Sequence, residues 1–202
     1  MEPLWRAVFG NGHPVEIEIG PGNGAFLLAA AARCPERNFF AIEHSRKRAR
    51  QLRALLQTRA HSNVSLLVAD AACVVTTLIP PRSVAAYHIY FPDPWWKRRH
   101  HRRRLFTPEF AAALSRTLVA DGRVYLATDV DMVFAFMLSA LTAEASLRHD
   151  ASARPPRLIV TSFERKGLLR GARISEATFI KNGCDESHTS SAAPITPAES
   201  PS

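Results

Sequence analysis

Long hydrophobic runs are absent from this 202-residue chain. The longest apolar stretch, residues 25–32, is far shorter than the roughly 18 residues needed to cross a bilayer. The first residues include Glu2 and Arg6, and they lack the apolar segment and small-residue cleavage site of a secretory signal. We therefore expect a cytoplasmic protein without a membrane segment.

Cysteine is also scarce. Cys34, Cys73 and Cys184 are widely separated and form no Cys-x-x-Cys pair, which argues against both a disulfide framework and a zinc site. The neighbouring residues His100 and His101 have no further ligand at metal-binding spacing. The sequence therefore predicts reduced thiols and no metal ion.

The charge is strongly biased, with 26 Lys and Arg against 18 Asp and Glu and a net charge of +8. Such an excess makes nucleic acid the first partner to consider. The last 21 residues, 182–202, contain 13 Ser, Thr, Ala or Pro, three acids and no Lys or Arg, a composition typical of a disordered acidic tail. Because this tail carries −3, the expected folded domain, residues 1–181, carries +11.

Short β-type runs alternate with longer helical runs before the tail, a pattern that predicts an α/β fold with a mostly parallel central sheet. Two later strands are expected to pair as an antiparallel C-terminal hairpin, because Gly167 and Gly171 lie between them. The expected strands are residues 15–19, 38–42, 64–68, 84–90, 123–127, 157–164 and 173–181. The expected helices are residues 24–33, 45–60, 71–78, 108–118 and 131–147. No feature of the sequence specifies an oligomeric state.

A glycine-rich turn follows the first expected strand. Gly20, Gly22 and Gly24 precede a predicted helix, and glycines at this point allow a tight turn and a close approach of the backbone to a ligand. The segment also fits the dinucleotide pattern G-x-G-x-x-[G/A], with Ala25 in the last position. A nicotinamide cofactor therefore remains an alternative at this stage.

Three carboxylates lie at the ends of the first three expected strands: Glu18, Glu43 and Asp70. Since the carboxyl ends of parallel strands line one crevice, the three side chains could bind one ligand. Glu43 is placed to accept hydrogen bonds from a ribose diol, and Asp70 is placed to reach the edge of an adenine. Glu18 could face a positively charged group, such as the one in a sulfonium cofactor with an amino acid tail. The alternative is that these acids are solvated or cap helices.

The fourth expected strand runs into Phe91-Pro92-Asp93-Pro94-Trp95-Trp96. The two prolines restrict the backbone on both sides of Asp93, and the tryptophans offer faces on which a base could stack. A dense basic segment follows, and it could contact phosphates or only be a solvated face. Its candidate phosphate contacts are Arg98, Arg99, His100, Arg102, Arg103 and Arg104. A second basic group, of lower weight, lies on the helix after the second strand, at Arg46, Lys47, Arg48, Arg50, Arg53 and Arg59.

These motifs give the chain its resemblance to a known family. Residues 14–181 resemble the bacterial-type tRNA (guanine-N7-)-methyltransferases, and the most specific match is Phe91-Pro92-Asp93-Pro94-Trp95-x-Lys97-x-Arg99-His100-x-x-Arg103-Arg104. Glu18-Ile19-Gly20-x-Gly22-x-Gly24, Ala127-Thr128-Asp129 and Thr161-Ser162-Phe163-Glu164-Arg165 support it. The resemblance implies a Rossmann-like methyltransferase fold with helices on both faces of the sheet.

The resemblance also implies an activity: methyl transfer from S-adenosylmethionine to N7 of a guanine in the variable loop of tRNA. It assigns cofactor binding to Glu18, Gly20, Gly22, Gly24, Glu43, Asp70 and Asp93. It assigns substrate binding to Lys97, Asp129, Thr161, Ser162, Phe163 and Glu164, with Asp93 also catalytic. The position of Asp129 also fits a helix cap. The alternatives are a non-catalytic or partner-dependent RNA-binding protein on this fold and an NAD-dependent oxidoreductase.

Overall fold

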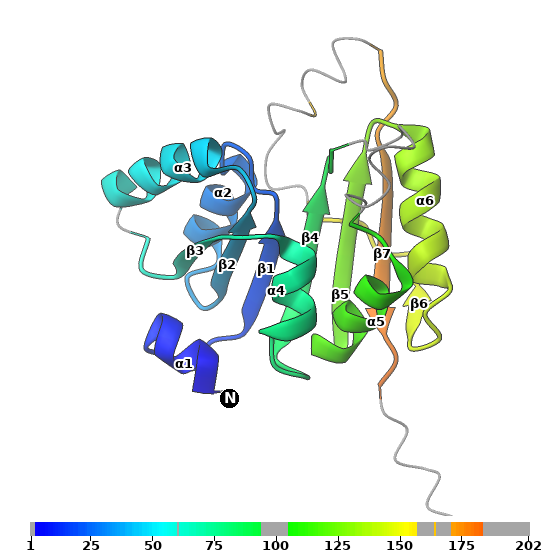
Figure 1. Cartoon of the computed structure of the whole chain (residues 1–202), viewed down its shortest axis with the longest axis horizontal. Coiled ribbons are helices and arrows are strands. Elements are labelled where there is room, and N and C mark those ends of the chain that lie inside the picture. Colours follow the sequence, from blue (N-terminus) through cyan, green and yellow to red (C-terminus); the bar gives the residue numbers. More distant parts are fainter. Residues whose placement is uncertain (1–2, 60, 94–104, 157–163, 165–170, 184–202) are drawn as a thin grey trace, which may run out of the picture.

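The computed structural model describes residues 3–59, 61–93, 105–156, 164 and 171–183 (Figure 1). Its helices are α1 (Pro3–Phe9), α2 (Ala25–Arg33), α3 (Arg46–Arg59), α4 (Ala71–Thr77), α5 (Pro108–Thr117) and α6 (Asp131–Thr142). Its strands are β1 (Val15–Ile19), β2 (Asn38–Glu43), β3 (Val64–Val68), β4 (Val84–Tyr90), β5 (Leu118–Thr128), β6 (Leu147–His149) and β7 (Ser175–Lys181).

The strands form one seven-stranded sheet in the order β3-β2-β1-β4-β5-β7-β6. β1 to β5 pair with one another in parallel, and β7 runs antiparallel to both β5 and β6. This confirms the predicted fold class, a mostly parallel sheet with an antiparallel C-terminal part. β2 and β3 are added to the sheet on one side of β1, and β4 and β5 on the other side, so the strand order reverses between β1 and β4. In open α/β sheets, ligands bind at such a switch point.

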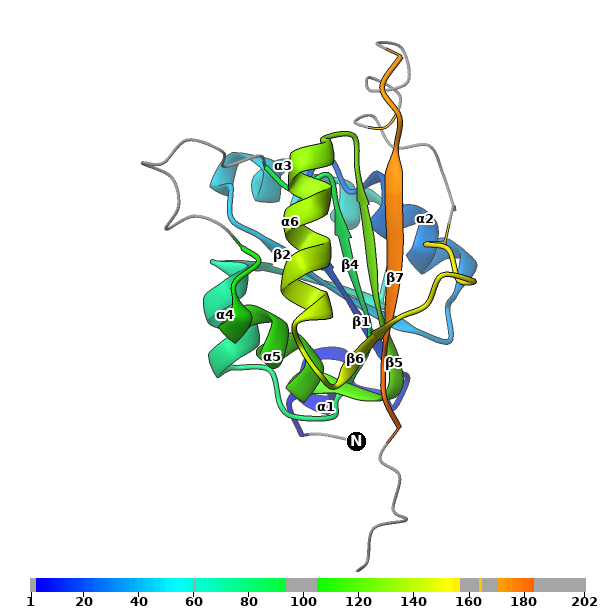
Figure 2. The same cartoon turned by 90° about the vertical axis from the view of Figure 1, so that its right-hand side faces the viewer.

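Helices cover both faces of the sheet, as Figure 2 shows for α4, α5 and α6 on one face and α2 on the other. Neighbouring strand residues point to opposite faces. Phe40 packs in the larger hydrophobic cluster with residues of α4, α5 and α6, whereas Phe39 packs in a smaller one with Leu27 of α2 and Leu52 of α3. β1 and β2 are therefore buried on both faces, and their sequences are largely apolar.

Local signals explain most element boundaries. The predicted bounds of β1, β3 and β4 are confirmed, and α5 begins as predicted, with Thr107 accepting a hydrogen bond from the backbone N–H of Phe110 (3.2 Å) and Pro108 in the first turn. Helix α1, which the sequence analysis did not predict, places Trp5 in the core at 1% exposure.

Two boundaries differ from the prediction by more than two residues. β5 begins at Leu118 rather than at residue 123, because the Asp121-Gly122 turn is a bulge within the strand: Leu118 is paired with Val84 and Arg123 with Ala86. The helix predicted to reach residue 147 ends at Thr142. A turn follows, in which Glu144 accepts hydrogen bonds from Ser146, and the chain then enters β6.

The C-terminal part is described only in segments. The predicted strand 157–164 lies outside the described residues except for Glu164, and β7 occupies most of the predicted strand 173–181. The predicted tail also lies outside them, except for two residues. One of these, Asn182, donates from its backbone N–H to Ser146 (3.0 Å) and from its side chain to Ala145 (3.2 Å). No helix among the described residues is long and apolar enough to cross a membrane.

Candidate functional site

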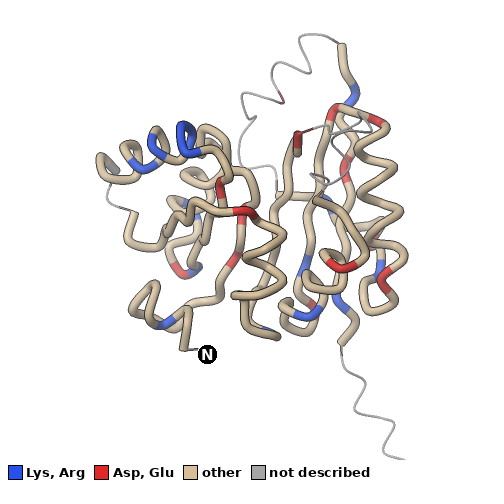
Figure 3. Tube along the Cα trace, viewed as in Figure 1, with Lys and Arg blue, Asp and Glu red and all other residues tan. Residues whose placement is uncertain are grey.

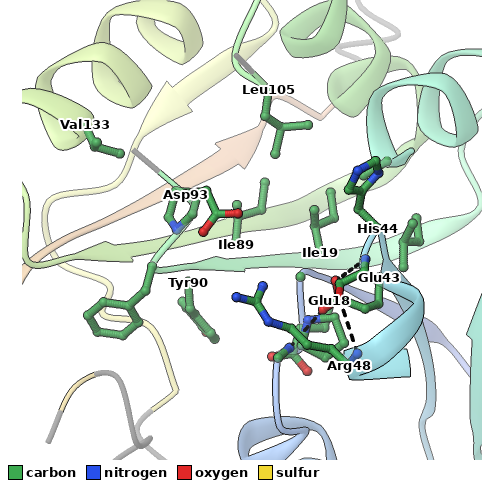
Figure 4. Close-up of a pocket in the computed structure, with 18 of the residues that line it drawn as sticks. Glu18, Ile19, Glu43, His44, Arg48, Ile89, Tyr90, Asp93, Leu105 and Val133 are labelled. Atoms are coloured by element: carbon green, nitrogen blue, oxygen red, sulfur yellow. Dashed lines mark hydrogen bonds between the residues drawn. The ribbon is translucent and has the colours of Figure 1, made fainter. Parts of the chain in front are cut away.

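A pocket of about 1110 Å³ opens at the carboxyl ends of the parallel strands (Figure 4). Glu18 and the glycine turn line it from β1, Glu43 from β2, Asp70 from the end of β3, and Tyr90 and Asp93 from β4 and the segment after it. Apolar residues complete it, at Leu105, Phe106, Val130, Met132, Val133, Phe136 and Met137. The predicted convergence of Glu18, Glu43 and Asp70 on one crevice is confirmed.

The glycine turn has two separate tasks. Gly20 and Gly22 line the pocket, and the backbone N–H of Gly22 donates to Oε2 of Glu43 (3.3 Å). Gly24 does not line it. Its φ is 74°, and a Cβ there would lie 2.3 Å from Cδ1 of Leu52, so this glycine permits close packing of the turn against α3.

Glu43 is a buried carboxylate held by backbone donors. It is 2% exposed, and besides the bond from Gly22 its Oε1 accepts the backbone N–H of Ser45 (2.7 Å). These bonds fix the carboxylate at the end of β2, where the oxygens keep further lone pairs for a ligand. The geometry therefore suits recognition of a hydroxyl pair.

Glu18 is buried without such support. It is 5% exposed, and its Oε2 has no hydrogen-bond partner. Burial, and secondarily the neighbouring Glu43, raise the pKa of Glu18 to about 8. A buried carboxyl that lacks a partner and lines a pocket is poised to meet a positive charge, which would restore its ionised form.

Asp70 is the exposed member of the set. It caps α4, with Oδ1 accepting the backbone N–H of Cys73 (2.9 Å), so the helix-capping interpretation is correct for this residue. The same side chain lines the pocket. Since the cap uses one oxygen, the second is available to a ligand.

Asp93 lies on the opposite side of the pocket from α3, on an exposed position after β4 (Figure 4). The residue before Pro92 does not have the extended backbone that a following proline favours. Phe91 has a φ of 49°, and its N–H donates to the carbonyl of Ala127 (2.7 Å). A left-handed conformation is costly for a bulky side chain, so the turn that aims Asp93 is strained.

The predicted substrate-binding residues are only partly described. Asp129 is half-buried after β5 and does not line the pocket, and Glu164 is buried and does not line it either. The helix cap considered for Asp129 is Val130 instead. The remaining predicted positions lie outside the described residues: Lys97, Arg98, Arg99, His100, Arg102, Arg103, Arg104, Thr161, Ser162 and Phe163.

Helix α3 brings positive charge to the pocket. Arg46, Lys47, Arg48, Arg50 and Arg53 are exposed, and Figure 3 shows the cations along this helix near the acids at the strand ends. Lys47 and Arg48 line the pocket, and Figure 4 shows Arg48 pointing into it. Part of the second basic group therefore belongs to the site.

The sequence analysis missed a buried polar network next to the pocket. His88 lies between Glu16, 2.7 Å from its Nε2, and the Tyr90 hydroxyl, 2.9 Å from its Nδ1. Arg37 donates to the other oxygen of Glu16. Alternation places these residues on one face of the sheet, because Glu16 lies two residues before Glu18 and His88 two before Tyr90, but it does not indicate which of them are in contact.

The residues present fit a nucleoside cofactor with a positively charged tail. The unpartnered oxygen of Glu18 lacks the cation that its burial calls for, and Glu43 is held in place for hydroxyl groups. A pyrophosphate would instead add negative charge beside two buried carboxyls. In the described part of the chain, no group of three or more His, Cys, Asp or Glu residues could hold a metal ion.

A Rossmann-like sheet with this site defines a methyltransferase that takes S-adenosylmethionine. The fold is shared by a solved 16S rRNA methyltransferase, KamB, at a TM-score of 0.64 and 16% identity over 91% of this chain and 94% of that one. A family model described as "Putative methyltransferase" matches residues 12–177.

Curated relatives identify the family. The tRNA (guanine-N(7)-)-methyltransferase of Paraburkholderia xenovorans (strain LB400) is 37% identical over 90% of this chain and 71% of the relative. That of Leifsonia xyli subsp. xyli (strain CTCB07) is 40% identical over 86% and 78%. The chain belongs to the tRNA (guanine-N(7)-)-methyltransferase family, which confirms the predicted family and cofactor and removes the nicotinamide alternative.

Proposed function

We propose that this protein transfers a methyl group from S-adenosylmethionine to N7 of a guanine in tRNA, and that the guanine lies in the variable loop. The observation that carries the proposal is the shared pocket: the cofactor carboxylates Glu18, Glu43 and Asp70 and the exposed Asp93 all line it. Family membership supports the tRNA substrate, and the resemblance of the Asp93 motif supports the variable-loop position.

Each cofactor-side residue has a role that follows from its surroundings. Glu43 accepts hydrogen bonds from the ribose hydroxyls, Asp70 accepts one from the adenine edge, and Glu18 neutralises positive charge. The glycine turn at Gly20 and Gly22 allows the backbone to approach the ligand closely. When bound, S-adenosylmethionine supplies a methyl group activated by attachment to a sulfonium.

Asp93 serves the acceptor base. Guanine N7 already has an in-plane lone pair, so no strong general base is required, and catalysis rests on positioning. A carboxylate at Asp93 accepts hydrogen bonds from guanine N–H groups and stabilises the positive charge that develops on the ring. The strained turn at Phe91 fixes where this carboxylate is held.

Two groups of basic residues are assigned to RNA binding. The cations of α3 stand beside the pocket, and the segment from Lys97 to Arg104 follows Asp93 directly in the chain. Both are suited to contact phosphates, which position the substrate without reading its sequence. A tRNA substrate also agrees with the cytoplasmic location expected from the sequence.

The proposal is tested with methyl-labelled S-adenosylmethionine and unmodified tRNA, followed by digestion and mass spectrometry of both nucleosides and mapped fragments. We expect label in 7-methylguanosine within the variable-loop fragment. Asp93→Ala should lower turnover by about a hundred-fold or more, because it removes a group that stabilises the transition state.

Asp131→Asn is the matched control, since this aspartate is exposed at the start of α6 and does not line the pocket. It should leave turnover unchanged. Label in another nucleoside or fragment would overturn the substrate assignment. Cofactor and tRNA binding without any label would favour the RNA-binding alternative, and full activity of Asp93→Ala would remove this residue from the mechanism.

A further inference from the structure

The network below the pocket runs through two adjacent strands of the sheet. Glu18 is the register partner of His88 between β1 and β4, so Glu16, Glu18, His88 and Tyr90 share one face. His88 is 1% exposed, and three aromatic rings surround it: Phe26 and Tyr90 at centroid distances of 4.7 and 5.7 Å, and Tyr125 stacked at 5.2 Å. The imidazole is thus fixed in position.

Hydrogen bonds also hold both ring nitrogens of His88, Nε2 to Glu16 and Nδ1 to the Tyr90 hydroxyl. Burial opposes ionisation of Glu16, but the hydrogen bonds from His88 and Arg37 outweigh it, so the pKa of Glu16 lies below its ordinary value. An ionised carboxylate only accepts, and it therefore holds the imidazole proton on Nε2. With the ring in the Nε2–H tautomer, Nδ1 accepts the hydroxyl proton of Tyr90.

This arrangement determines what Tyr90 offers to the pocket. In this tautomer the hydroxyl proton is directed at His88, so the oxygen presents only lone pairs to a ligand. Burial, and next the Glu18 carboxyl, raise the pKa of Tyr90 well above its ordinary value, so the hydroxyl stays protonated. Tyr90 and Glu18 both line the pocket, where Oε2 of Glu18 also lacks a partner.

We propose that Tyr90 is a ligand-binding residue that, together with Glu18, accepts hydrogen bonds from the positively charged tail of the cofactor, and that Glu16 and His88 are positioning residues that hold its hydroxyl as an acceptor. The inference rests on the proposed function only for the identity of the cofactor. It requires neither tRNA binding nor methyl transfer.

The test measures dissociation constants by calorimetry for three ligands: S-adenosylmethionine, S-adenosylhomocysteine, which keeps the ammonium without the sulfonium, and 5′-methylthioadenosine, which lacks the amino acid tail. Tyr90→Phe should weaken the first two by roughly ten-fold, the value of a hydrogen bond to a charged group, and leave the third unchanged. A loss confined to S-adenosylmethionine would also support the proposal and identify the sulfonium as the group bound.

His88 is tested by two variants. His88→Leu should reproduce the Tyr90→Phe pattern, because the hydroxyl is no longer held. His88→Gln can still accept from Tyr90 and donate to Glu16, and it should restore part of the affinity. Tyr125→Phe is the matched control: it keeps the stacked ring on His88 and lies outside the pocket lining, so all three dissociation constants should stay unchanged.

Two results would overturn the inference. If Tyr90→Phe weakened the binding of all three ligands equally, Tyr90 would contribute only packing contacts to the pocket. If it weakened none, the hydroxyl would have no part in binding. Thermal unfolding of each variant shows that the fold is intact, and failure of the wild-type protein to methylate tRNA would affect the proposed function without changing either conclusion.

Discussion

Glu16 and Glu18 are two residues apart on β1 and point to the same face of the sheet, yet their surroundings are opposite. Glu16 has His88 and Arg37 as partners, and its pKa lies below the ordinary value. Glu18 has a buried oxygen without a partner, and its pKa is raised to about 8. One carboxylate has its partners within the protein, and the other has a buried oxygen without one.

The two acids illustrate two kinds of buried carboxyl: one that has partners within the fold, and one that lacks them. A buried charge with partners stabilises the fold or leaves its stability unchanged, whereas a buried group without them costs stability that the fold must supply elsewhere. The second case marks a site where function requires the cost. Glu16 and Glu18 should therefore differ in how their substitution changes the free energy of unfolding and cofactor affinity.

The largest effect is expected at the partnered acid. Glu16→Ala leaves the buried His88 Nε2–H and the Arg37 guanidinium without their acceptor, and should lower the free energy of unfolding by about 3 kcal/mol. Urea unfolding measures it. Glu16→Gln keeps an acceptor oxygen and is the control, with a smaller loss; a free energy of unfolding unchanged in Glu16→Ala would contradict the structural role.

The unpartnered acid should respond in the opposite way. Glu18→Gln removes a buried acid that has no partner, so the free energy of unfolding should not fall. Affinity for S-adenosylmethionine should drop by about thirty-fold, which corresponds to about 2 kcal/mol for a charge-assisted hydrogen bond. Calorimetry checks the affinity, and equal binding by the variant and the wild type would remove Glu18 from the site.

Stability should also depend on pH with opposite signs at the two residues. Because its pKa is raised from 4.5 to about 8, Glu18 binds more protons in the folded state, and it lowers stability progressively as pH rises between these values. Glu16 has a lowered pKa, so its contribution is present above 4.5 and is lost as pH falls through the folded-state pKa.

Urea unfolding from pH 4 to 8 separates the two slopes. The stability of Glu18→Gln relative to the wild type should increase with pH, and that of Glu16→Gln should decrease as pH rises from 4. A difference between Glu18→Gln and the wild type that stays constant over this range would show that the pKa of Glu18 is not raised in the folded state.

The smallest effect is expected at the edge of the Glu16 network. The Arg37 side chain is 44% exposed, so solvent screens its bond to Glu16. Arg37→Gln should lower the free energy of unfolding by about 0.5 kcal/mol, and less at high salt. A loss as large as that of Glu16→Ala would show that Arg37, rather than His88, is the main partner.

Local patterns explain why much of the architecture could be predicted. The apolar strands, the glycine turn, and Thr107 before Pro108 act through neighbouring residues, and the structure confirms β1, β3, β4 and the start of α5. Glu18, Glu43 and Asp70 could be brought together because the carboxyl ends of parallel strands meet at one edge. These inferences need only strand order and direction.

The missed features depend on tertiary contacts. Asp121-Gly122 indicates a turn, but pairing with β4 makes it a bulge within β5. His88 on a buried strand has no local signal for its partner, because Glu16 is 72 positions away in the sequence. The role of Gly24 likewise depends on Leu52 of a different helix. Spacing alone cannot provide such contacts.

The left-handed φ of Phe91 links the thermal stability of the protein to its activity. A glycine at this position would relieve about 1 kcal/mol of strain, and stabilising substitutions at strained functional positions commonly reduce activity. Glycine would also free the backbone next to Pro92 and Asp93. Selection for thermal stability alone would therefore favour replacement of Phe91 by glycine, whereas selection for turnover would retain the phenylalanine. At this residue, the two selective pressures on the enzyme oppose each other.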